Sequence, residues 1–427
     1  MARFIIRGGS KLNGVFRPMG NKNAALPMLA ASVLADEPVV LHNVPRIVDV
    51  EVMGELLASM GADVSFDGHT ARVCAKGLRP RPLDATLCRR VRSSILLAGP
   101  LAARHGRAVL PPPGGDVIGR RRLDTHFGGL RALGIEVSPT PPYRFRRRTL
   151  RGTDILQDEA SVTATENLLM AAVLADGRTT VFNAACEPHV CELARLLVGM
   201  GARIEGIGTN RLIVDGVARL HGAEITVEPD YIEAGSFLAA AAATRGELVI
   251  RDAPGPDTTH IIARAFRTLG IEWTVTPKGE WSLESRQPRR IRADAGGALP
   301  KIEDGPWPAF PSDLMSVAIV LATQVRGSAL FFEKMFESRM YFVDRLIEMG
   351  AQVIQCDPHR VVTHGPARLH GQVLTSPDIR AGMSLLIAAL CARGTSVIEN
   401  AQMIDRGHER IDERLRALGA SIERDGG

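Results

Sequence analysis

Aromatic residues and cysteines are scarce in this chain of 427 residues, and none of its apolar runs is long. Only 4% of the residues are aromatic and no predicted helix concentrates the basic charge, so we expect no nucleic-acid binding. The longest apolar runs, such as residues 237–243, are too short to cross a bilayer. The opening residues, MARFIIRGG, lack the apolar core of a signal peptide. These absences predict a cytoplasmic location without membrane insertion.

The six cysteines show no CxxC spacing, which argues against a disulfide framework and against a paired-cysteine zinc site. Cys186, His189 and Cys191 lie close enough in sequence to be considered as metal ligands. No second ligand cluster accompanies them, so we predict no metal site.

A sequence motif that ends in glycine and a short predicted strand recurs six times. Each copy reads as the end of a leucine-rich helix, then Gly, then apolar residues, as in LASMGADV at residues 57–64. The glycines follow one another at intervals of about 70 residues: Gly61, Gly134, Gly201, Gly270, Gly350 and Gly419. A fixed period of this length indicates an architecture of repeated units.

A second motif accompanies each copy and contains a small-residue helix, a polar turn and a β-branched strand, as in ENLLMAAVLADGRTTVFNA from residue 166. This helix is apolar nearly all round and should be buried, whereas the helix that ends in glycine is amphipathic and should be outer. The chain is too long for one ordinary core. The sequence therefore predicts an α/β fold of six units, arranged as two globular halves of three units each.

Basic residues stand where several of the buried helices should begin, at Lys22, Arg92 and Arg380. A cation is unfavourable at a helix N-terminus, where the helix dipole is positive. An anion held between these side chains and the backbone N–H groups would explain them. The net charge of +5 agrees with an anionic substrate. The alternative interpretation is that these cations are solvated and repel one another weakly.

Residues 111–122, PPPGGDVIGRRR, combine prolines, glycines, one carboxylate and three arginines. Proline and glycine at this density predict a mobile loop. Its arginines suit a lid that closes over a bound anion. An ordinary surface loop with arginines in water is the alternative.

Six motifs occur in order along nearly the whole chain: GNKNAALP (20–27), PPGGDVIGRRRLDTH (112–126), SVTATEN (161–167), FPSD (310–313), DIR (378–380) and IDRGHERI (404–411). Together they resemble the UDP-N-acetylglucosamine 1-carboxyvinyltransferases, the enolpyruvyl transferases of peptidoglycan synthesis. The resemblance implies a two-domain inside-out α/β barrel built from six repeated units. One domain would span residues 22–229 and carry the lid loop 111–122, and the other would span 1–21 plus 230–427.

The resemblance also implies a reaction. The enolpyruvyl group of phosphoenolpyruvate would move to the 3-hydroxyl of UDP-N-acetylglucosamine with release of phosphate, by addition and elimination through a tetrahedral ketal. This would be the first committed step of peptidoglycan synthesis. Phosphoenolpyruvate is already activated, so no cofactor is expected, and the partners are phosphoenolpyruvate and a uridine nucleotide sugar.

Site residues follow from the resemblance motif by motif. Those implied to carry the chemistry are Lys22 at the phosphate, Arg406 at phosphoenolpyruvate, Asp313 as the base on the sugar hydroxyl and Asp116 as the acid to C3. Those implied to bind substrate are Asn23, Arg92, Arg121, Asp124, Ser161, Asp378 and Arg380. Asp124 and Ser161 match the region that binds the UDP part, and Arg92 and Arg121 surround phosphoenolpyruvate.

Asp116 departs from the resembled pattern, which usually has cysteine at this loop position. Aspartate can still donate a proton if desolvation raises its pKa. It cannot form the thioether that fosfomycin makes with that cysteine, so we predict insensitivity to fosfomycin.

Four other residues depart from the resembled pattern, and several of them lie on the acceptor side: Thr163 replaces glycine in SVGAT, Arg122 replaces proline, Tyr231 replaces arginine and His189 replaces glutamate. A side chain at position 163 would crowd a backbone contact with the diphosphate. Thr163 and Arg122 motivate an alternative in which the acceptor is another nucleotide, such as UMP, in specialised metabolism.

Three further alternatives agree less well with the residues. A shikimate-pathway transferase would carry Ser-Lys-Ser and GNAGT motifs, which are absent. A binding paralogue without turnover would have lost Lys22, Asp313 or Arg406, and all three are present. A scaffold of repeats explains neither the cations at the helix starts nor the glycine-rich loop.

Overall fold

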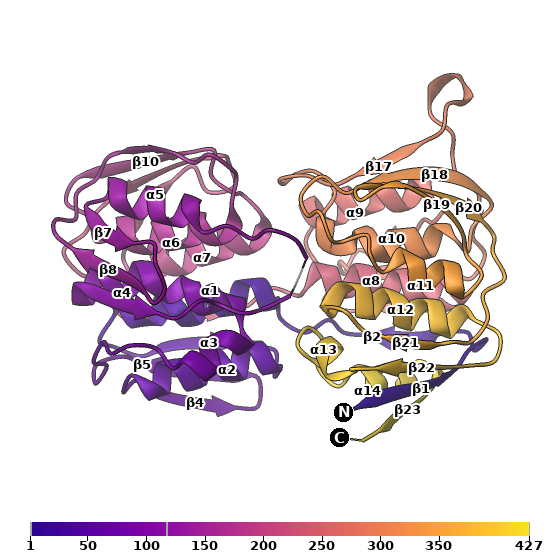
Figure 1. Ribbon diagram of the computed structural model, residues 1–427, viewed down its shortest axis with the longest axis horizontal. Helices are drawn as coiled ribbons and strands as arrows, with labels where there is room; N and C mark the ends of the chain where they lie inside the picture. Colours follow the sequence, from indigo (N-terminus) through magenta and orange to yellow (C-terminus); the bar gives the residue numbers. More distant parts are fainter. Residues whose placement is uncertain (1, 117, 427) are drawn as a thin grey trace. The chain divides into compact units, whose positions relative to one another are not determined.

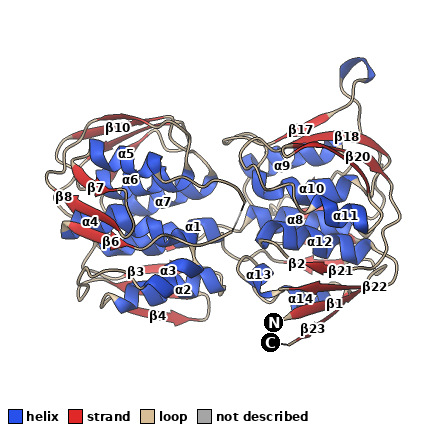
Figure 2. Ribbon diagram, viewed as in Figure 1, coloured by secondary structure: helices blue, strands red, loops and turns tan. Residues whose placement is uncertain are grey.

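The computed structural model describes residues 2–116 and 118–426, and these form two compact units. We call residues 20–116 with 121–228 the N-unit, and residues 2–19, 118–120 and 229–426 the C-unit. The predicted α/β fold is confirmed, and in each unit apolar helices lie inside while sheets lie outside (Figures 1 and 2). The predicted domain boundaries, 22–229 against 1–21 plus 230–427, stay a prediction about independent folding.

The described part of the N-unit contains three sheets. Their strand orders are β13(Glu224–Thr226)-β3(Val39–His42)-β5(Thr70–Cys74)-β4(Asp63–Asp67), β6(Arg107–Leu110)-β8(Tyr143–Arg147)-β7(Ile135–Ser138), and β11(Arg203–Glu205)-β12(Arg211–Asp215)-β10(Arg178–Phe182)-β9(Asp154–Leu156). Its helices are α1(Lys22–Ala31), α2(Val48–Ser59), α3(Ala85–Arg90), α4(Ala98–His105), α5(Asp124–Ala132), α6(Val162–Ala172) and α7(Pro188–Gly199), with the 3₁₀ helices η1(Ser32–Leu34) and η2(Arg92–Leu97).

Three sheets are likewise found in the described part of the C-unit. Their strand orders are β21(Val373–Thr375)-β22(Thr395–Glu399)-β1(Arg3–Arg7)-β23(Ser421–Asp425), β15(Thr274–Val275)-β16(Trp281–Leu283)-β14(Glu247–Ile250)-β2(Asn13–Phe16), and β17(Lys301–Glu303)-β18(Gly327–Phe332)-β20(Arg360–Gly365)-β19(Gln352–Asp357). Its helices are α8(Tyr231–Ala243), α9(Pro256–Thr268), α10(Met315–Ala322), α11(Val343–Glu348), α12(Ile379–Cys391), α13(Gln402–Asp405) and α14(Ile411–Ala417), with the 3₁₀ helices η3(Ala295–Gly297) and η4(Ser312–Leu314).

The N-terminal strands complete sheets of the C-unit. Strand β1 pairs antiparallel with both β22 and β23, and β2 pairs in parallel with β14. The two ends of the chain therefore lie on neighbouring strands of one sheet (Figure 1).

The recurring glycines end the amphipathic helices. Each follows the C-cap residue of α2, α5, α7, α9, α11 or α14, and each has a positive φ, between 72° and 101°. Only glycine adopts this left-handed conformation without a steric cost, and it turns the chain from helix into strand. The repeat read from the sequence is thus a backbone requirement of the fold.

The small-residue helices form the core. All thirteen residues of α8 are buried, as are all eight of α10. The buried helix expected to begin at Arg92 departs from the others, because it divides into the 3₁₀ helix η2 and the α-helix α4. Pro100 lies in the first turn of α4, where proline is tolerated but cannot continue a preceding helix.

Candidate active site

Lys22 begins the buried helix α1 and lies in a polar contact with a second helix. Asn21 caps α1 by accepting hydrogen bonds from the backbone N–H groups of Asn23 and Ala24. Lys22 Nζ lies 2.7 Å from Oδ2 of Asp49, which belongs to the first turn of α2, and both side chains are buried. The carboxylate stabilises the buried ammonium group at a position where the helix dipole disfavours it. Asn23 follows Lys22 and is half-buried.

Arg92 and Arg121 form a second concentration of positive charge in the N-unit. Arg92 begins η2, and its Nη2 donates a 2.6 Å hydrogen bond to the backbone oxygen of Arg121. Burial and then the charge of Arg121 lower the pKa of Arg92 to about 10. A bound anion would offset both the lost hydration and the repulsion. The structure therefore brings together two of the arginines predicted from the sequence.

The glycines of the predicted lid loop allow it to lie against Arg92. Gly115 has φ of 105°, and a Cβ at this residue would come 2.8 Å from Cβ of Arg92. The preceding Gly114 donates its backbone N–H to the Cys88 carbonyl oxygen at 2.9 Å. Asp116, the predicted acid, comes next and is half-buried. The sequence G-G-D thus places this carboxyl one residue from a contact with Arg92.

Residues 118–120 of the predicted loop belong to the C-unit and hydrogen-bond with other residues of that unit. Arg120 donates its backbone N–H to Oε2 of Glu337 at 3.1 Å, and Ser338 donates its own to the Ile118 carbonyl oxygen at 3.2 Å. Val117 belongs to the predicted loop but lies outside the described residues. Closure of the loop as a lid stays a prediction.

A buried polar network organises the start of α6, next to the predicted binding residue Ser161. Asn167 donates to the ring nitrogen Nδ1 of His126 at 3.0 Å, and His126 Nε2 lies 3.1 Å from Oγ1 of Thr163. Because the amide N–H of Asn167 occupies Nδ1, the His126 proton sits on Nε2 and is donated to Thr163. Burial and the charge of Arg92 lower the pKa of His126 to about 3, so the ring is neutral.

This network gives a structural reason for threonine at position 163. Without the hydroxyl, a buried imidazole N–H would have lost its acceptor. We predict that Thr163→Gly lowers the free energy of unfolding by about 1–3 kcal/mol, the usual cost of an unsatisfied buried donor, whereas Thr163→Ser stays close to wild type. Chemical denaturation measures both. Equal stability of the glycine variant and the wild type would contradict this role.

Asp124 lies at the exposed start of α5 and is paired with one of the unusual residues. Arg122 Nε donates to Oδ2 of Asp124, and both side chains are more than half exposed. The structure therefore joins Arg122 to a residue predicted to bind the UDP part. Neither side chain contributes to a core.

Two other departures are buried residues at helix starts. Tyr231 is the first residue of α8, and its ring centroid lies 6.0 Å from that of Trp307. His189 lies in the first turn of α7 and is 4% exposed. Burial, followed by the charge of Glu187, raises the pKa of nearby Glu166 well above its ordinary value. These positions belong to the packed interior of their units.

In the C-unit, the predicted base Asp313 is held by two arginines. Its Oδ1 accepts from Nη2 of Arg339 at 3.0 Å, and its Oδ2 accepts from Nη2 of Arg380 at 2.8 Å. Both arginine side chains are more than nine-tenths buried, whereas 26% of the Asp313 side chain is exposed. The carboxylate therefore has an exposed portion while its orientation is fixed from behind.

Asp378 and Arg380 occupy the start of the buried helix α12. Oδ1 of Asp378 accepts from the backbone N–H groups of Arg380 and Ala381 at 2.8 and 2.9 Å. This cap fixes the first turn from which Arg380 reaches Asp313. The structure brings Arg380 into contact with both Asp313 and Asp378, whereas Arg406 follows α13 and is half-buried.

Sequence reasoning did not find Arg339. It precedes α11 by several residues and stands at no predicted helix start. Its guanidinium lies over the ring of Phe336, 5.0 Å from the centroid, which fixes its orientation toward Asp313. No local pattern in the sequence signals this contact.

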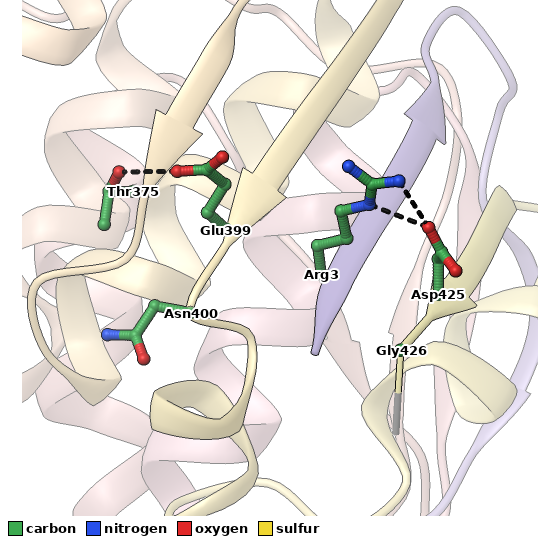
Figure 3. A pocket seen from close by; sticks show the side chains of 6 residues that line it. All are labelled: Arg3, Thr375, Glu399, Asn400, Asp425 and Gly426. Atoms are coloured by element: carbon green, nitrogen blue, oxygen red, sulfur yellow. Dashed lines mark hydrogen bonds and ion pairs between the residues drawn. The ribbon is translucent and has the colours of Figure 1, made fainter. Parts of the chain in front are cut away.

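A pocket of about 620 Å³ lies in the C-unit, and Figure 3 shows residues that line it. Its lining includes Arg3 and Asp425, which form an ion pair of 2.6 Å between β1 and β23. None of the predicted site residues lines it. The candidate site rests on the charged clusters described above.

The described residues contain neither a cluster suited to a metal ion nor a helix suited to cross a membrane. No group of three or more His, Cys, Asp or Glu side chains is arranged to hold a metal ion within residues 2–116 and 118–426. Within the same ranges, no helix has the length and apolar character needed to cross a membrane.

Comparison with known proteins places the chain in a family. It matches EPSP synthase (3-phosphoshikimate 1-carboxyvinyltransferase) over residues 6–415. A protein of Bradyrhizobium diazoefficiens named UDP-N-acetylglucosamine 1-carboxyvinyltransferase is 55% identical over 99% of this chain and 98% of its own. One of the same name from Treponema pallidum is 51% identical over 100% of both chains. The chain therefore belongs to the enolpyruvyl (1-carboxyvinyl) transferase family.

Solved structures show the same fold at low sequence identity. The enolpyruvyl transferase NikO from Streptomyces tendae has a TM-score of 0.88 and 24% identity, covering 100% of this chain and 99% of its own. An EPSP synthase from Acinetobacter baumannii has a TM-score of 0.76 and 19% identity over the whole of both chains. The repeated-unit architecture is thus that of enolpyruvyl transferases.

Proposed function

We propose that this protein transfers the enolpyruvyl group of phosphoenolpyruvate to the 3-hydroxyl of UDP-N-acetylglucosamine and releases phosphate. The observation that carries the proposal is the 55% identity, over nearly the full length of both chains, with a relative that bears this activity as its name. The reaction would be the first committed step of peptidoglycan synthesis, and we place it in the cytoplasm.

The N-unit would supply the cations for phosphoenolpyruvate. Lys22, Arg92 and Arg121 would hold its phosphate and carboxylate, and the arginines suit this because they stay charged and bind oxyanions in a bidentate manner. The neutral His126 beside Arg92 adds no competing positive charge. Asn23, Asp124 and Ser161 would contact the sugar nucleotide.

Proton transfers would involve two carboxyl groups. Asp116 would donate a proton to C3 of phosphoenolpyruvate while positive charge develops at C2. Asp313 would accept the proton of the sugar hydroxyl, and Arg339 and Arg380 support its ionised form at 3.0 and 2.8 Å. Asp378 would fix the helix start that carries Arg380, and Arg406 would contact phosphoenolpyruvate.

The alternative acceptor is UMP, and it is compared with UDP-N-acetylglucosamine in the measurement of phosphate release. The names of the relatives favour the sugar nucleotide. Thr163, the residue that first suggested a different acceptor, is accounted for by its hydrogen bond to His126.

Anion binding at Arg92 has a measurable consequence for stability. A ligand present at a hundred times its Kd adds about 2.7 kcal/mol to the free energy of unfolding if it binds only the native state. We therefore expect phosphoenolpyruvate to raise the thermal unfolding midpoint of the wild type and to raise that of Arg92→Gln much less.

The matched control is Arg81→Gln, because Arg81 is an exposed arginine of the same unit. An equal rise in the Arg92 and Arg81 variants would remove Arg92 from the binding site.

The product identifies the reaction. Mass spectrometry of a mixture of protein, phosphoenolpyruvate and UDP-N-acetylglucosamine should show the sugar nucleotide carrying one added enolpyruvyl group. Consumption of phosphoenolpyruvate without this adduct would contradict the proposed transfer.

A further inference from the structure

Two carboxyl groups outside the predicted site lie side by side in the C-unit. Strands β17 and β18 run parallel, with Glu303 opposite Phe332. Asp304 and Glu333 are the next residues, so each directly follows the C-terminal end of its strand, and the two ends lie side by side. Parallel pairing thus juxtaposes two acidic side chains that are 29 residues apart in sequence.

Both groups are buried and accept hydrogen bonds. Glu333 is fully buried, and its Oε1 and Oε2 accept from Oγ of Ser312 at 2.8 and 2.9 Å. The backbone N–H of Phe336 adds a 3.2 Å bond to Oε1. Asp304 is 1% exposed, and its Oδ1 accepts from the backbone N–H of Lys334 at 2.5 Å.

Oδ2, the remaining oxygen of Asp304, is buried. Oδ2 receives no N–H or O–H from any donor within residues 2–116 and 118–426, although the side chain is in hydrogen-bond contact with Glu333. Two ionised carboxylates in such contact, away from water, would repel strongly. A proton shared between the two carboxyl groups removes this repulsion.

The surrounding charges agree with a retained proton. Burial raises the pKa of Glu333, the contact with Asp304 raises it further, and Arg339 and Ser312 lower it, with a result of about 9. Among neighbouring titratable groups, His359 faces only the backbone oxygen of Glu333, and Lys334 pairs with Glu303. At neutral pH the pair then carries one proton and one negative charge.

The pair touches two elements that hold Asp313. Ser312, bound by both oxygens of Glu333, is the residue immediately before Asp313. Arg339, whose charge acts on Glu333, donates to Oδ1 of Asp313. Loss of the shared proton would add a second negative charge that competes with Asp313 for Arg339.

We propose that Asp304 and Glu333 share one proton and that this singly charged pair is a positioning device for Asp313, acting through Ser312 and Arg339. The effect on turnover rests on the proposed function, in which Asp313 is the base. The sharing of the proton itself does not depend on that function.

Amide substitutions test the sharing. In Glu333→Gln or Asp304→Asn the amide N–H replaces the shared proton and the pair keeps one negative charge. In the double variant, the oxygen of the amide at position 304 must still accept from the backbone N–H of Lys334. The oxygen of the amide at position 333 must likewise accept from that of Phe336. Two N–H₂ groups then face each other. We expect each single variant to keep turnover within about threefold at neutral pH and the double variant to lose about tenfold or more, the scale of a buried donor without acceptor.

The dependence of turnover on pH gives a second readout. In the wild type, kcat should fall as pH rises through about 9, because the pair then loses its proton. That fall should be absent in both single variants. The proposal is overturned if the double variant is as active as the single variants, if the single variants lose as much as the double, or if the alkaline fall persists in both.

Thermal unfolding separates this proposal from the proposed function. Between pH 4.5 and about 9, Glu333 ionises in the unfolded chain but not in the folded one, so rising pH favours unfolding. The thermal unfolding midpoint of Glu333→Gln, relative to that of the wild type, should therefore increase as pH rises through this window. A constant difference would exclude the retained proton even if no acceptor gave turnover. A widening difference without turnover would support the pair and contradict the function.

Discussion

Replacing Asp313 with asparagine should lower kcat by about 10² or more, the usual scale for a general base, while phosphoenolpyruvate and the sugar nucleotide still bind. Asparagine has nearly the same shape but cannot accept the proton of the sugar hydroxyl. The asparagine oxygen can still accept from one of the two arginines that hold Asp313, so the side chain keeps one of its two contacts. Steady-state kinetics gives kcat, and calorimetric titration gives both affinities.

Asp257→Asn is the matched control, because Asp257 is an exposed aspartate of the C-unit in the first turn of α9. It should behave as wild type in both measurements. A wild-type rate in Asp313→Asn would exclude Asp313 as the base. Loss of binding with kcat unchanged would assign it a binding role instead.

Fosfomycin should leave the wild-type protein active. The resemblance implies that Asp116 stands at the loop position that fosfomycin alkylates when it is a cysteine, and a carboxylate forms no thioether. Two of the protein's own thiols are poor substitutes, because burial raises the pKa of Cys88 to about 11 and that of Cys391 to about 12, which leaves little thiolate at either residue. The enzyme activity that remains after long incubation with fosfomycin measures the effect. The mass of the intact protein then shows whether an adduct has formed.

Asp116→Cys should remain active and become inactivated by fosfomycin, with one adduct on residue 116. Asp116→Ser, which has no thiol, is the control and should resist. Inactivation of the wild type, or an adduct on another cysteine, would contradict the placement of Asp116 at the reacting end of the loop.

Much of the fold could be predicted because its causes are local. A left-handed residue after each amphipathic helix requires glycine, so the six positive-φ glycines appear in the sequence as a repeat. Helices with every residue buried consist mainly of apolar and small residues, as in α10 and in α8, where Glu233 is the only charged residue of the helix. In the second of the six repeated units, the buried helix divides into η2 and α4. The sequence did not predict this division, because the helical pattern continues through Gly99 and Pro100.

The site was predictable where a charge conflicts with a helix dipole. Arg92 and Arg380 begin helices, and that conflict can be recognised in the sequence alone. Asp304, Glu333 and Arg339 carry no such signal, because their importance arises from parallel strand pairing and from side chains that reach Asp313 across the fold. The roles assigned to individual residues stay predictions until the variants are measured.

Phosphate release from phosphoenolpyruvate is the most direct test of the central claim, compared with UDP-N-acetylglucosamine, with UMP and without acceptor. Enolpyruvyl transfer to the sugar nucleotide predicts release only when UDP-N-acetylglucosamine is present. Release only with UMP would keep the chemistry but contradict the acceptor. Absence of release with both would contradict the proposed function.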